Sequence, residues 1–367
     1  MSARHRLSSE AGYSLVEMLV STAIMITVTG AIFGLINPAQ GTSQAQPEQS
    51  DLQQRMRIGA DTLFKELLMA GAGPYFGNRT GSLVNFFAPI VPRRMGLING
   101  DARDVALPDR ITLSYVPNSY SQTSISQAMP PQSAEVKVTQ PPNCPIAKEL
   151  CGFETGMNVI IFDSSGHYDT FTVTQVQDSA AHLQHRGQAF NYGYGAGSTI
   201  TQVVTNTYFR NVTTNQLMRY DGGTSEAAIV DNVVDLRLEY FGEVNPPLTP
   251  KPSPGSGANC LYDDVGNYAP NPAMPVLPAD EGSLAILPLE MFKDGPWCGG
   301  GDTEFDADLL RIRKVRVTLR MQVASPSLRG TDGTLFANPG KSQGGNRLVP
   351  DYFVRFDITP RNLNLTR

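Results

Sequence analysis

The sequence predicts an α+β protein in which a long amino-terminal transmembrane helix precedes a mostly antiparallel β-sheet head. Three observations predict this fold class: the segment 13–36 is almost entirely apolar, the segment 52–70 repeats apolar residues at helical spacing, and several later segments alternate apolar with polar residues. Apolar residues make up 41% of the 367 residues and charged residues 17%, so the head has enough apolar content for a globular core.

The segment 13–36, YSLVEMLVSTAIMITVTGAIFGLI, is the candidate membrane span. As a helix it would be about 36 Å long at 1.5 Å per residue, and the hydrocarbon core of a bilayer is about 30 Å thick. Arg4 and Arg6 precede it, so the short leader should stay in the cytoplasm and the rest of the chain should be exported. No small-residue cleavage site follows Ile36, which disfavours an ordinary secretory signal. A plain signal anchor is an open alternative.

Glu17 is the only charged residue in this segment. An acidic side chain in lipid is costly, so an intramembrane carboxylate indicates a function and a partner, although one near the end of a span can also reach the headgroups. The residues from Gly12 to Glu17, GYSLVE, followed by the long apolar run, resemble the processing site of type IV prepilins. In that family the residue after the glycine is commonly Phe, whereas this chain has Tyr13.

The resemblance implies that the prepilin peptidase removes residues 1–12 as a leader by cutting after Gly12. Tyr13 would then become the first residue and would be N-methylated. The helix 13–36 would be kept, first in the membrane and later in the core of a filament. Glu17 would neutralise the α-amino group of a neighbouring subunit. Because an ion pair in a low dielectric tolerates little misplacement, this contact would set the axial register.

The segment 37–73 should contain an interruption followed by a second helix. Pro38, Gly41 and Pro47 predict a kink or a melted segment over about 37–49, because a proline costs about 3 kcal/mol inside a helix. Gly71 and Gly73 end the second helix. Its apolar face, which should dock on the head, consists of Leu52, Met56, Ala60, Leu63, Leu67 and Ala70. The stretch 53–73, QQRMRIGADTLFKELLMAGAG, resembles the corresponding part of PilW-like minor pilins.

The head, residues 74–367, should consist mainly of strands. Period-two alternation is strongest in 234–240, 315–323 and 352–358, and the order of these segments loosely resembles the same family. Weaker strand candidates are 110–116, 157–163, 170–176, 201–210 and 216–220, the last two joined by a turn at 213–215. Short connections favour antiparallel pairing. The segments 118–145 and 245–278 are rich in Pro, Ser and Asn, and we expect surface loops or insertions there.

The four cysteines fit disulfides in an oxidising compartment better than a metal site, since no C-x-x-C pair is present. We favour Cys144 with Cys151 and Cys260 with Cys298, because each pair brackets a loop rich in Pro or Gly. Four cysteines allow three pairings, so the other two stay open. Loop closure would make the favoured disulfides worth about 2.5 and about 4 kcal/mol.

The sequence offers little sign of catalysis, and we expect neither a cofactor nor a metal site. It lacks the H-E-x-x-H motif. His182 and His185 should be surface or strand residues, and the segment around His167 should be a hairpin turn. One acidic run alternates along the chain and consists of Asp302, Glu304, Asp306 and Asp308. Its carboxylates are oxygen ligands of the kind that Ca²⁺ prefers, but a solvated acidic turn is the simpler interpretation.

The resemblance therefore implies a minor pilin, a non-enzymatic subunit that primes assembly of a type IV pilus or sits at its tip. Its partners would be the prepilin peptidase, other major and minor pilins, the inner-membrane assembly platform and, before assembly, membrane lipid. The chain would cross the inner membrane once, with its head in the periplasm, and later reach the pilus or cell surface. A net charge of −5 gives no reason to expect nucleic acid. The alternatives are a minor pseudopilin of type II secretion, a signal-anchored adhesin or binding domain, and an exported enzyme.

Overall fold

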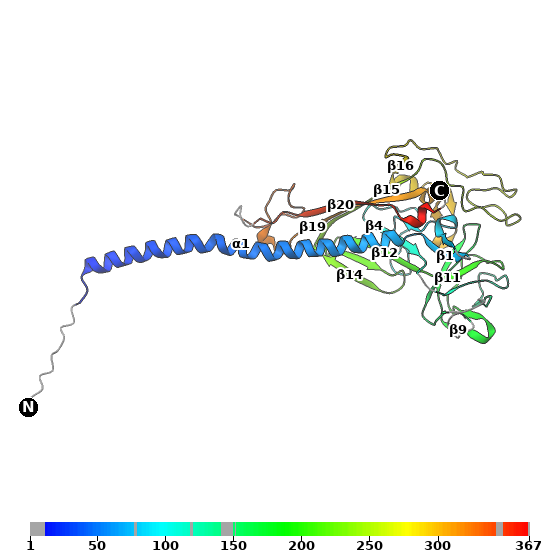
Figure 1. Cartoon of the computed structure of the whole chain (residues 1–367), viewed down its shortest axis with the longest axis horizontal. Coiled ribbons are helices and arrows are strands. Elements are labelled where there is room, and N and C mark those ends of the chain that lie inside the picture. The colour runs from blue at the N-terminus through cyan, green and yellow to red at the C-terminus, as the bar shows by residue number, and fades with distance from the viewer. Residues whose placement is uncertain are drawn as a thin grey trace, which may run out of the picture. The chain divides into compact units, whose positions relative to one another are not determined.

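The computed structural model describes residues 12–76, 79–117, 120–140, 150, 152–342 and 348–365 (Figure 1). It confirms the α+β class, with one long helix followed by antiparallel sheets. The chain forms two compact units, one of Met1–Leu52 with Val323–Asp351 and the other of Gln53–Gln322 with Tyr352–Arg367. The second unit contains all of the sheets.

The helix α1 runs without interruption over Leu15–Met69 and includes both helices that the sequence predicts. The expected melted segment at 37–49 is therefore wrong, although Pro38 and Pro47 lie inside it. A proline removes one backbone donor, but helical turns on both sides are already formed, and continuing a helix is far easier than starting one. Beyond Met69 the helix stops at Gly71, whose φ of 77° is the left-handed conformation typical of a helix end.

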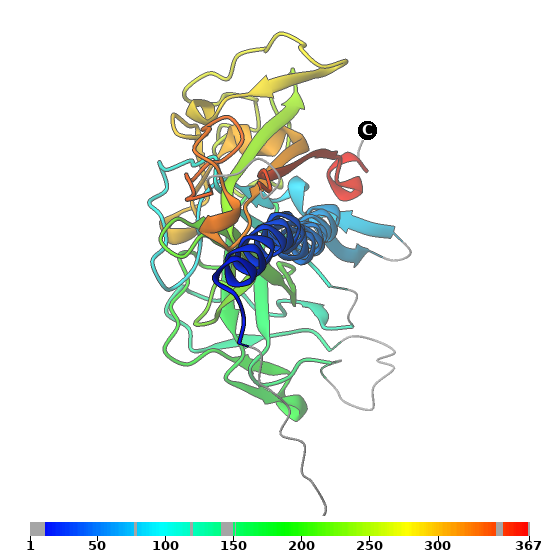
Figure 2. The ribbon, with the colours of Figure 1, turned by 90° about the vertical axis from the view of Figure 1, so that its left-hand side faces the viewer.

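The carboxyl-terminal part of α1 packs against two sheets of the second unit, which lie on either side of it (Figure 2). Gly59 lies close to both sheets. A Cβ built there would lie 3.1 Å from Leu319 of one sheet and 3.9 Å from Leu217 of the other. Farther along, the rings of Phe64 and Phe356 are 6.4 Å apart. The predicted apolar face is confirmed, since four of its members are buried in this unit: Met56, Leu63, Leu67 and Ala70.

The two main sheets are antiparallel throughout. The first has the order β14-β13-β12-β4-β3, with β3 Ile90–Val91, β4 Arg110–Tyr115, β12 Val204–Asn211, β13 Gln216–Tyr220 and β14 Glu226–Asp231. The second has the order β16-β15-β19-β20, with β15 Val233–Glu243, β16 Leu284–Leu287, β19 Ile312–Met321 and β20 Tyr352–Ile358. The three strong strand predictions are confirmed as β15, β19 and β20.

The weaker strand predictions are confirmed with changed boundaries. The segment 201–210 is divided between β11 (Thr199–Gln202) and β12, and the segment 170–176 between β8 (Tyr168–Thr172) and β9 (Gln175–Gln177). The predicted turn between β12 and β13 is confirmed. There Asn215 has a φ of 53°, and the Asn211 side chain accepts hydrogen bonds from the amides of Thr213 and Thr214 at 3.0 and 3.2 Å.

Two smaller sheets lie between β4 and β12 in the sequence. Their orders are β5-β11-β7-β8 and β6-β10-β9, with β5 Gln122–Ser124, β6 Glu135–Lys137, β7 Asn158–Phe162 and β10 His182–Gln184. For the segment 118–145, where we expect surface loops or insertions, a surface loop is thus wrong at β5 and β6. Strands of three residues are too short to show an alternating pattern, so the turn-forming residues around them dominated the prediction.

The remaining elements are short. Two two-stranded sheets pair β1 (Ala72–Phe76) with β2 (Arg79–Ser82) and β17 (Trp297–Cys298) with β18 (Phe305–Asp306). The 3₁₀ turns are η1 Leu83–Asn85, η2 Asp178–Ala180, η3 Leu289–Phe292, η4 Gly301–Thr303, η5 Ala307–Arg311, η6 Pro326–Leu328 and η8 Arg361–Asn364. The segment 245–278 contains no helix or strand longer than an isolated bridge, as the sequence predicts.

Candidate functional site

The start of α1 brings together the three residues that the sequence assigns to processing and assembly. Gly12 and Tyr13 lie just before the helix in exposed, non-helical chain, and the Tyr13 side chain is 87% exposed. Glu17 lies in the first turn of the helix. The peptide bond between Gly12 and Tyr13 is therefore accessible and free of secondary structure, which a peptidase requires of its substrate.

Ser14 and Glu17 form a capping box at this helix start. The Ser14 amide donates to Glu17 Oε2 at 2.9 Å, and the Glu17 amide donates to Ser14 Oγ at 3.2 Å. Two amides that have no partner within the helix are satisfied in this way. This role was not predicted, although the spacing S-x-x-E before an apolar run is its usual signal. Glu17 thus has a partner within its own chain.

The span Leu15–Leu35 is long and apolar enough to cross a membrane. Its side chains are exposed along the whole segment. Two of its threonine hydroxyl groups bond back to the helix backbone: Thr22 donates to Met18 O at 2.7 Å, and Thr27 donates to Ala23 O at 2.8 Å. These hydroxyls need no water, so they are compatible with lipid or with neighbouring helices. The helix is a membrane anchor or a signal by these criteria.

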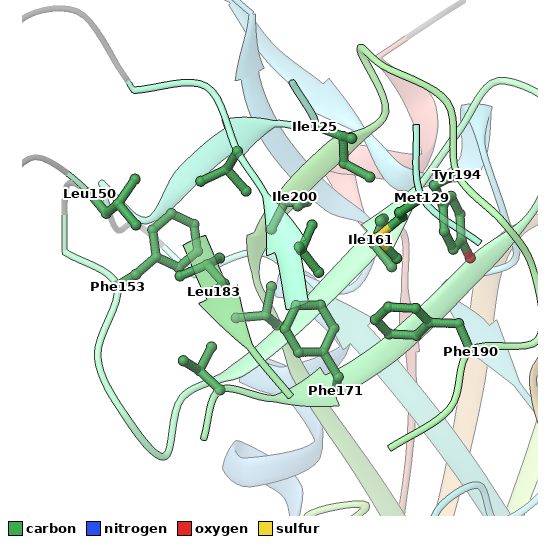
Figure 3. Packing of buried hydrophobic residues seen from close by; sticks show 14 residues of the cluster. Ile125, Met129, Leu150, Phe153, Ile161, Phe171, Leu183, Phe190, Tyr194 and Ile200 are labelled. Carbon is green, nitrogen blue, oxygen red and sulfur yellow. The ribbon is translucent and has the colours of Figure 1, made fainter. Parts of the chain in front are cut away.

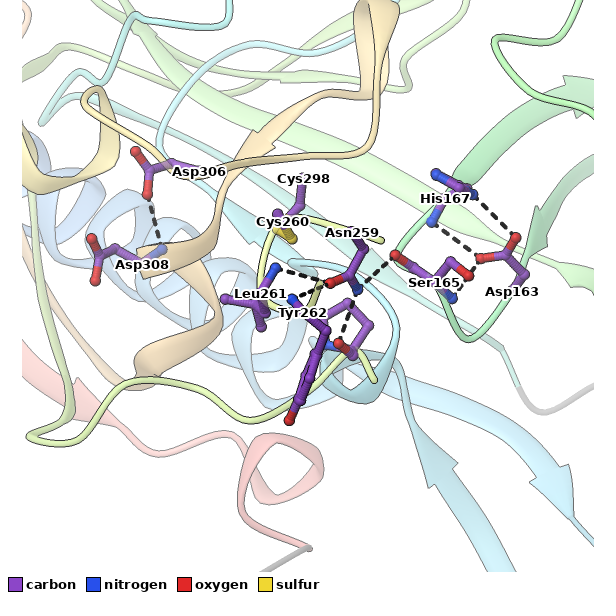
Figure 4. Close-up of a disulfide and its surroundings, with 11 residues drawn as sticks. Asp163, Ser165, His167, Asn259, Cys260, Leu261, Tyr262, Cys298, Asp306 and Asp308 are labelled. Carbon is purple, nitrogen blue, oxygen red and sulfur yellow. Dashed lines mark hydrogen bonds and ion pairs between the residues drawn. A yellow bond between two sulfur atoms is a disulfide. The ribbon is translucent and has the colours of Figure 1, made fainter. Parts of the chain in front are cut away.

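The disulfide between Cys260 and Cys298 confirms one of the two predicted pairs, with 5.0 Å between the Cα atoms. Cys144 and Cys151 lie outside the described residues. Asn259, next to the disulfide, organises the surrounding loops (Figure 4). Its Nδ2 donates to Ser165 O at 3.0 Å and to Pro250 O at 3.1 Å, while its Oδ1 accepts from two following amides. A disulfide indicates that the head lies outside the cytoplasm.

The acidic run differs from the expected solvated turn. Asp302 is exposed, but Asp306 and Asp308 are buried, so the prediction is wrong for these two. Asp306 accepts from the amides of Gly295 and Asp308 at 2.6 and 2.9 Å. Burial raises the pKa of Asp306 to about 6 and that of Asp308 to about 7. The alternating acidic residues did not by themselves predict this burial, because acidic residues are rarely enclosed without a partner.

Arg311 is that partner. Its side chain is fully buried, and its Nε lies 2.7 Å from Asp308 Oδ1. The same guanidinium donates to Val244 O and Pro275 O, at 3.2 and 2.8 Å, and so holds both ends of the 245–278 loop. Among the described residues, one group of three carboxylates is close enough to share an ion, namely Asp294, Asp306 and Asp308. Asp294 is exposed, whereas Asp308 is buried beside the positive charge of Arg311, so the ion pair explains the burial of Asp308.

The histidines take separate partners. His167 lies in the β7–β8 turn, as predicted, where its Nδ1 is 3.2 Å from Asp163 Oδ2 (Figure 4). Its ring stacks on Tyr192. His182, in β10, pairs with Glu135 at 3.4 Å. His185 is fully buried, against the expectation of a surface or strand position. The H-x-x-H spacing therefore carries no sign of a shared metal.

A hydrogen bond to the backbone fixes the tautomer of the buried His185. Its Nδ1 lies 2.8 Å from the Gln188 carbonyl oxygen, so this nitrogen donates. Its Nε2 is buried without a hydrogen-bond partner, and the ring packs against Phe171 and Phe190. Burial lowers the pKa of His185, because a charged imidazolium would be poorly solvated there.

No known family model matches the chain, and no curated protein matches it either.

Proposed function

We propose that this chain is a membrane-anchored minor pilin, a structural subunit of a type IV pilus and not an enzyme. The observation that carries the proposal is the sequence GYSLVE at the start of an uncovered apolar helix that leads into a β-rich, disulfide-bonded head. The accessible bond between Gly12 and Tyr13 and the capped helix beginning at Leu15 support the role of this segment as a processing site.

In this proposal, the prepilin peptidase cuts after Gly12 at the cytoplasmic face of the inner membrane, and Tyr13 is then N-methylated. The head folds in the periplasm, where the Cys260–Cys298 disulfide forms. The assembly platform next extracts the subunit from lipid, and the exposed apolar side chains of α1 pack among the helices of major and minor pilins. Burial of this apolar surface stabilises the filament.

Glu17 sets the register of assembly in this scheme. One of its oxygens, Oε2, accepts from the Ser14 amide of its own chain. The α-ammonium group of a neighbouring subunit, released by cleavage, would pair with the same carboxylate. In an apolar helix bundle, a carboxylate without a positive partner is costly, so subunits should add only where this pairing can form.

The test is the variant Glu17→Ala, with Asp61→Ala as the matched control. Asp61 is an exposed carboxylate on the same helix but beyond the span. We expect Glu17→Ala to be processed at Gly12 yet absent from purified pili, whereas Asp61→Ala enters them as the parent does. Incorporation of Glu17→Ala at the parent level would contradict the register role.

The same geometry fits a minor pseudopilin of type II secretion, because both classes share the processed helix and the β-rich head. Deleting the gene and measuring both pilus number and protein secretion separates them. Loss of pili with normal secretion supports the pilin proposal, and normal pili with defective secretion supports the pseudopilin.

A further inference from the structure

The chain between β4 and β12 leaves the five-stranded sheet and returns to the same point. These two strands are antiparallel neighbours, paired from Arg110 with Phe209 to Tyr115 with Val204. Paired residues in an antiparallel sheet have Cα atoms about 4.5–5.5 Å apart, a gap that a two-residue turn can close. Residues 116–203 therefore form an insertion, which we call the inserted lobe.

The inserted lobe has its own hydrophobic core (Figure 3). Fourteen buried residues form one cluster, and every member lies between Ile125 and Ile200. The central members come from three strands, with Ile161 from β7, Phe171 from β8 and Ile200 from β11. A contiguous apolar cluster drawn from one segment of the chain is what distinguishes a domain core from a loop packed on a neighbour.

The lobe contacts the rest of the second unit along the β7–β8 turn, at β5 and at the segment 299–301, where Asn191 and Tyr192 lie against Gly301 and Gly300. At the β7–β8 turn, the rings of Tyr168 and Phe87 stack with centroids 4.2 Å apart, and Thr303 Oγ1 donates to Tyr168 O at 2.8 Å. At β5, Gln122 exchanges hydrogen bonds with the backbone of Tyr75. The side chain of Phe162, next to Ile161 in β7, faces Phe86, with ring centroids 4.7 Å apart. Ile161 therefore belongs to the lobe core and not to these contacts.

We propose that the inserted lobe is a separate cooperative unit, which anchoring and filament assembly do not require. Tyr115 and Val204, which flank the lobe, are paired with each other, so the two main sheets keep their register without it. Joining these two residues by a short turn costs little entropy. The claim about assembly rests on the proposed pilin function, whereas the claim about folding does not. Assembly would then depend on α1 and the main sheets, and the lobe would be free to serve contacts outside the filament core.

A matched pair of substitutions in the full-length chain tests the folding claim. Ile161→Asp puts a charge into the lobe core, and Leu113→Asp puts one into β4 of the main sheet; both parent side chains are fully buried. Hydrogen exchange followed by mass spectrometry is measured on each. We expect Ile161→Asp to lose protection in the lobe only, with exchange in β12, β15 and β19 within about twofold of the parent. Leu113→Asp should lose protection throughout, or should fail to accumulate.

A rise of about tenfold or more in exchange at β12, β15 and β19 of Ile161→Asp would overturn the claim, because the lobe would then unfold together with the sheets. Failure of this variant to accumulate would overturn it as well.

A second variant tests assembly by replacing residues 116–203 with Asn-Gly, which favours a two-residue hairpin turn. We expect this chain to accumulate in the membrane and to enter pili at the parent level. Loss of the protein would contradict separability, and accumulation without entry into pili would show that the lobe takes part in assembly. If the parent itself never enters pili, the pilin proposal fails, and the exchange measurement still decides whether the lobe is separate.

Discussion

Gly59 provides a quantitative test of how α1 docks on the two sheets. A Cβ at this position would lie 3.1 Å from Leu319 Cδ2, 3.3 Å from Val230 Cγ2 and 3.9 Å from Leu217 Cδ2. The first two distances are shorter than ordinary van der Waals contact, so the neighbouring methyl groups must shift by a few tenths of an ångström. These methyls are the ends of side chains, and Leu319 in particular can adjust.

The expected effects follow from two opposing terms. Replacing glycine by alanine in a helix interior stabilises it by about 1 kcal/mol, and the crowding at Leu319 and Val230 offsets part of this gain. We therefore expect Gly59→Ala to change the free energy of unfolding by less than about 1 kcal/mol. Leucine has nearly the same helix propensity as alanine, but its extra carbons enter filled space. Gly59→Leu should be less stable than Gly59→Ala by about 1–3 kcal/mol.

The assay is urea unfolding of the detergent-solubilised chain, followed by circular dichroism and by fluorescence of Trp297, the one tryptophan in the sequence. The control is the exposed position Gln54 in the same helix, where Ala and Leu variants should differ by less than about 0.5 kcal/mol. Equal urea midpoints for Gly59→Leu and Gly59→Ala would refute the close packing of α1 on both sheets.

Three further predictions concern the head. Replacing both Cys260 and Cys298 by Ser should lower the free energy of unfolding by about 4 kcal/mol in the chain-entropy model, since the residues are 38 apart; a loss below about 1 kcal/mol would contradict it. Burial raises the pKa of Asp308 to about 7, so the folded chain binds this proton before the unfolded chain does, and this group should make the protein more stable as the pH falls from about 8 to 5; Asp308→Asn, which is neutral throughout, should remove that contribution to the urea midpoints, the exposed Asp302→Asn should keep it, and identical pH profiles for the two variants would contradict the assignment. Burial lowers the pKa of His185, so the unfolded chain binds this proton first, and the contribution of His185 to stability is lost as the pH drops below about 6.5; the urea midpoint of His185→Leu should therefore rise relative to that of the parent between pH 8 and 5, and a constant difference between the two chains would exclude this role.

The parts of the fold that follow from periodicity could be predicted from the sequence. In β19, Val315, Val317 and Leu319 are fully buried on one face, while Arg316 and its polar neighbours occupy the other, so the alternation is plain. The apolar face of α1 is equally clear. Pro38 and Pro47 misled the prediction, because local propensity is a weak prior and the helix is continuous on both sides of each proline.

The inserted lobe and the charged cluster could not be predicted in the same way. Strands such as β5 have three residues, and their partners are distant in the sequence, so no local pattern marks them. The burial of Asp308 depends on Arg311, and the spacing of three residues between them was a readable but weak signal. The spacing of Ser14 and Glu17 was a clear signal of a capping box, whereas the loop between Cys260 and Cys298 only favoured that pairing among the three possible ones.

The most direct test of the pilin proposal is the amino terminus of the membrane-extracted protein, determined by sequencing and intact mass in cells with and without the prepilin peptidase. The proposal predicts a chain that begins at Tyr13 and carries an N-methyl group when the peptidase is present, and a chain that still carries residues 1–12 when it is absent. A protein that retains Met1 through Gly12 in the presence of active peptidase would contradict the account, because no α-amino group would be released beside Glu17 for the filament to use.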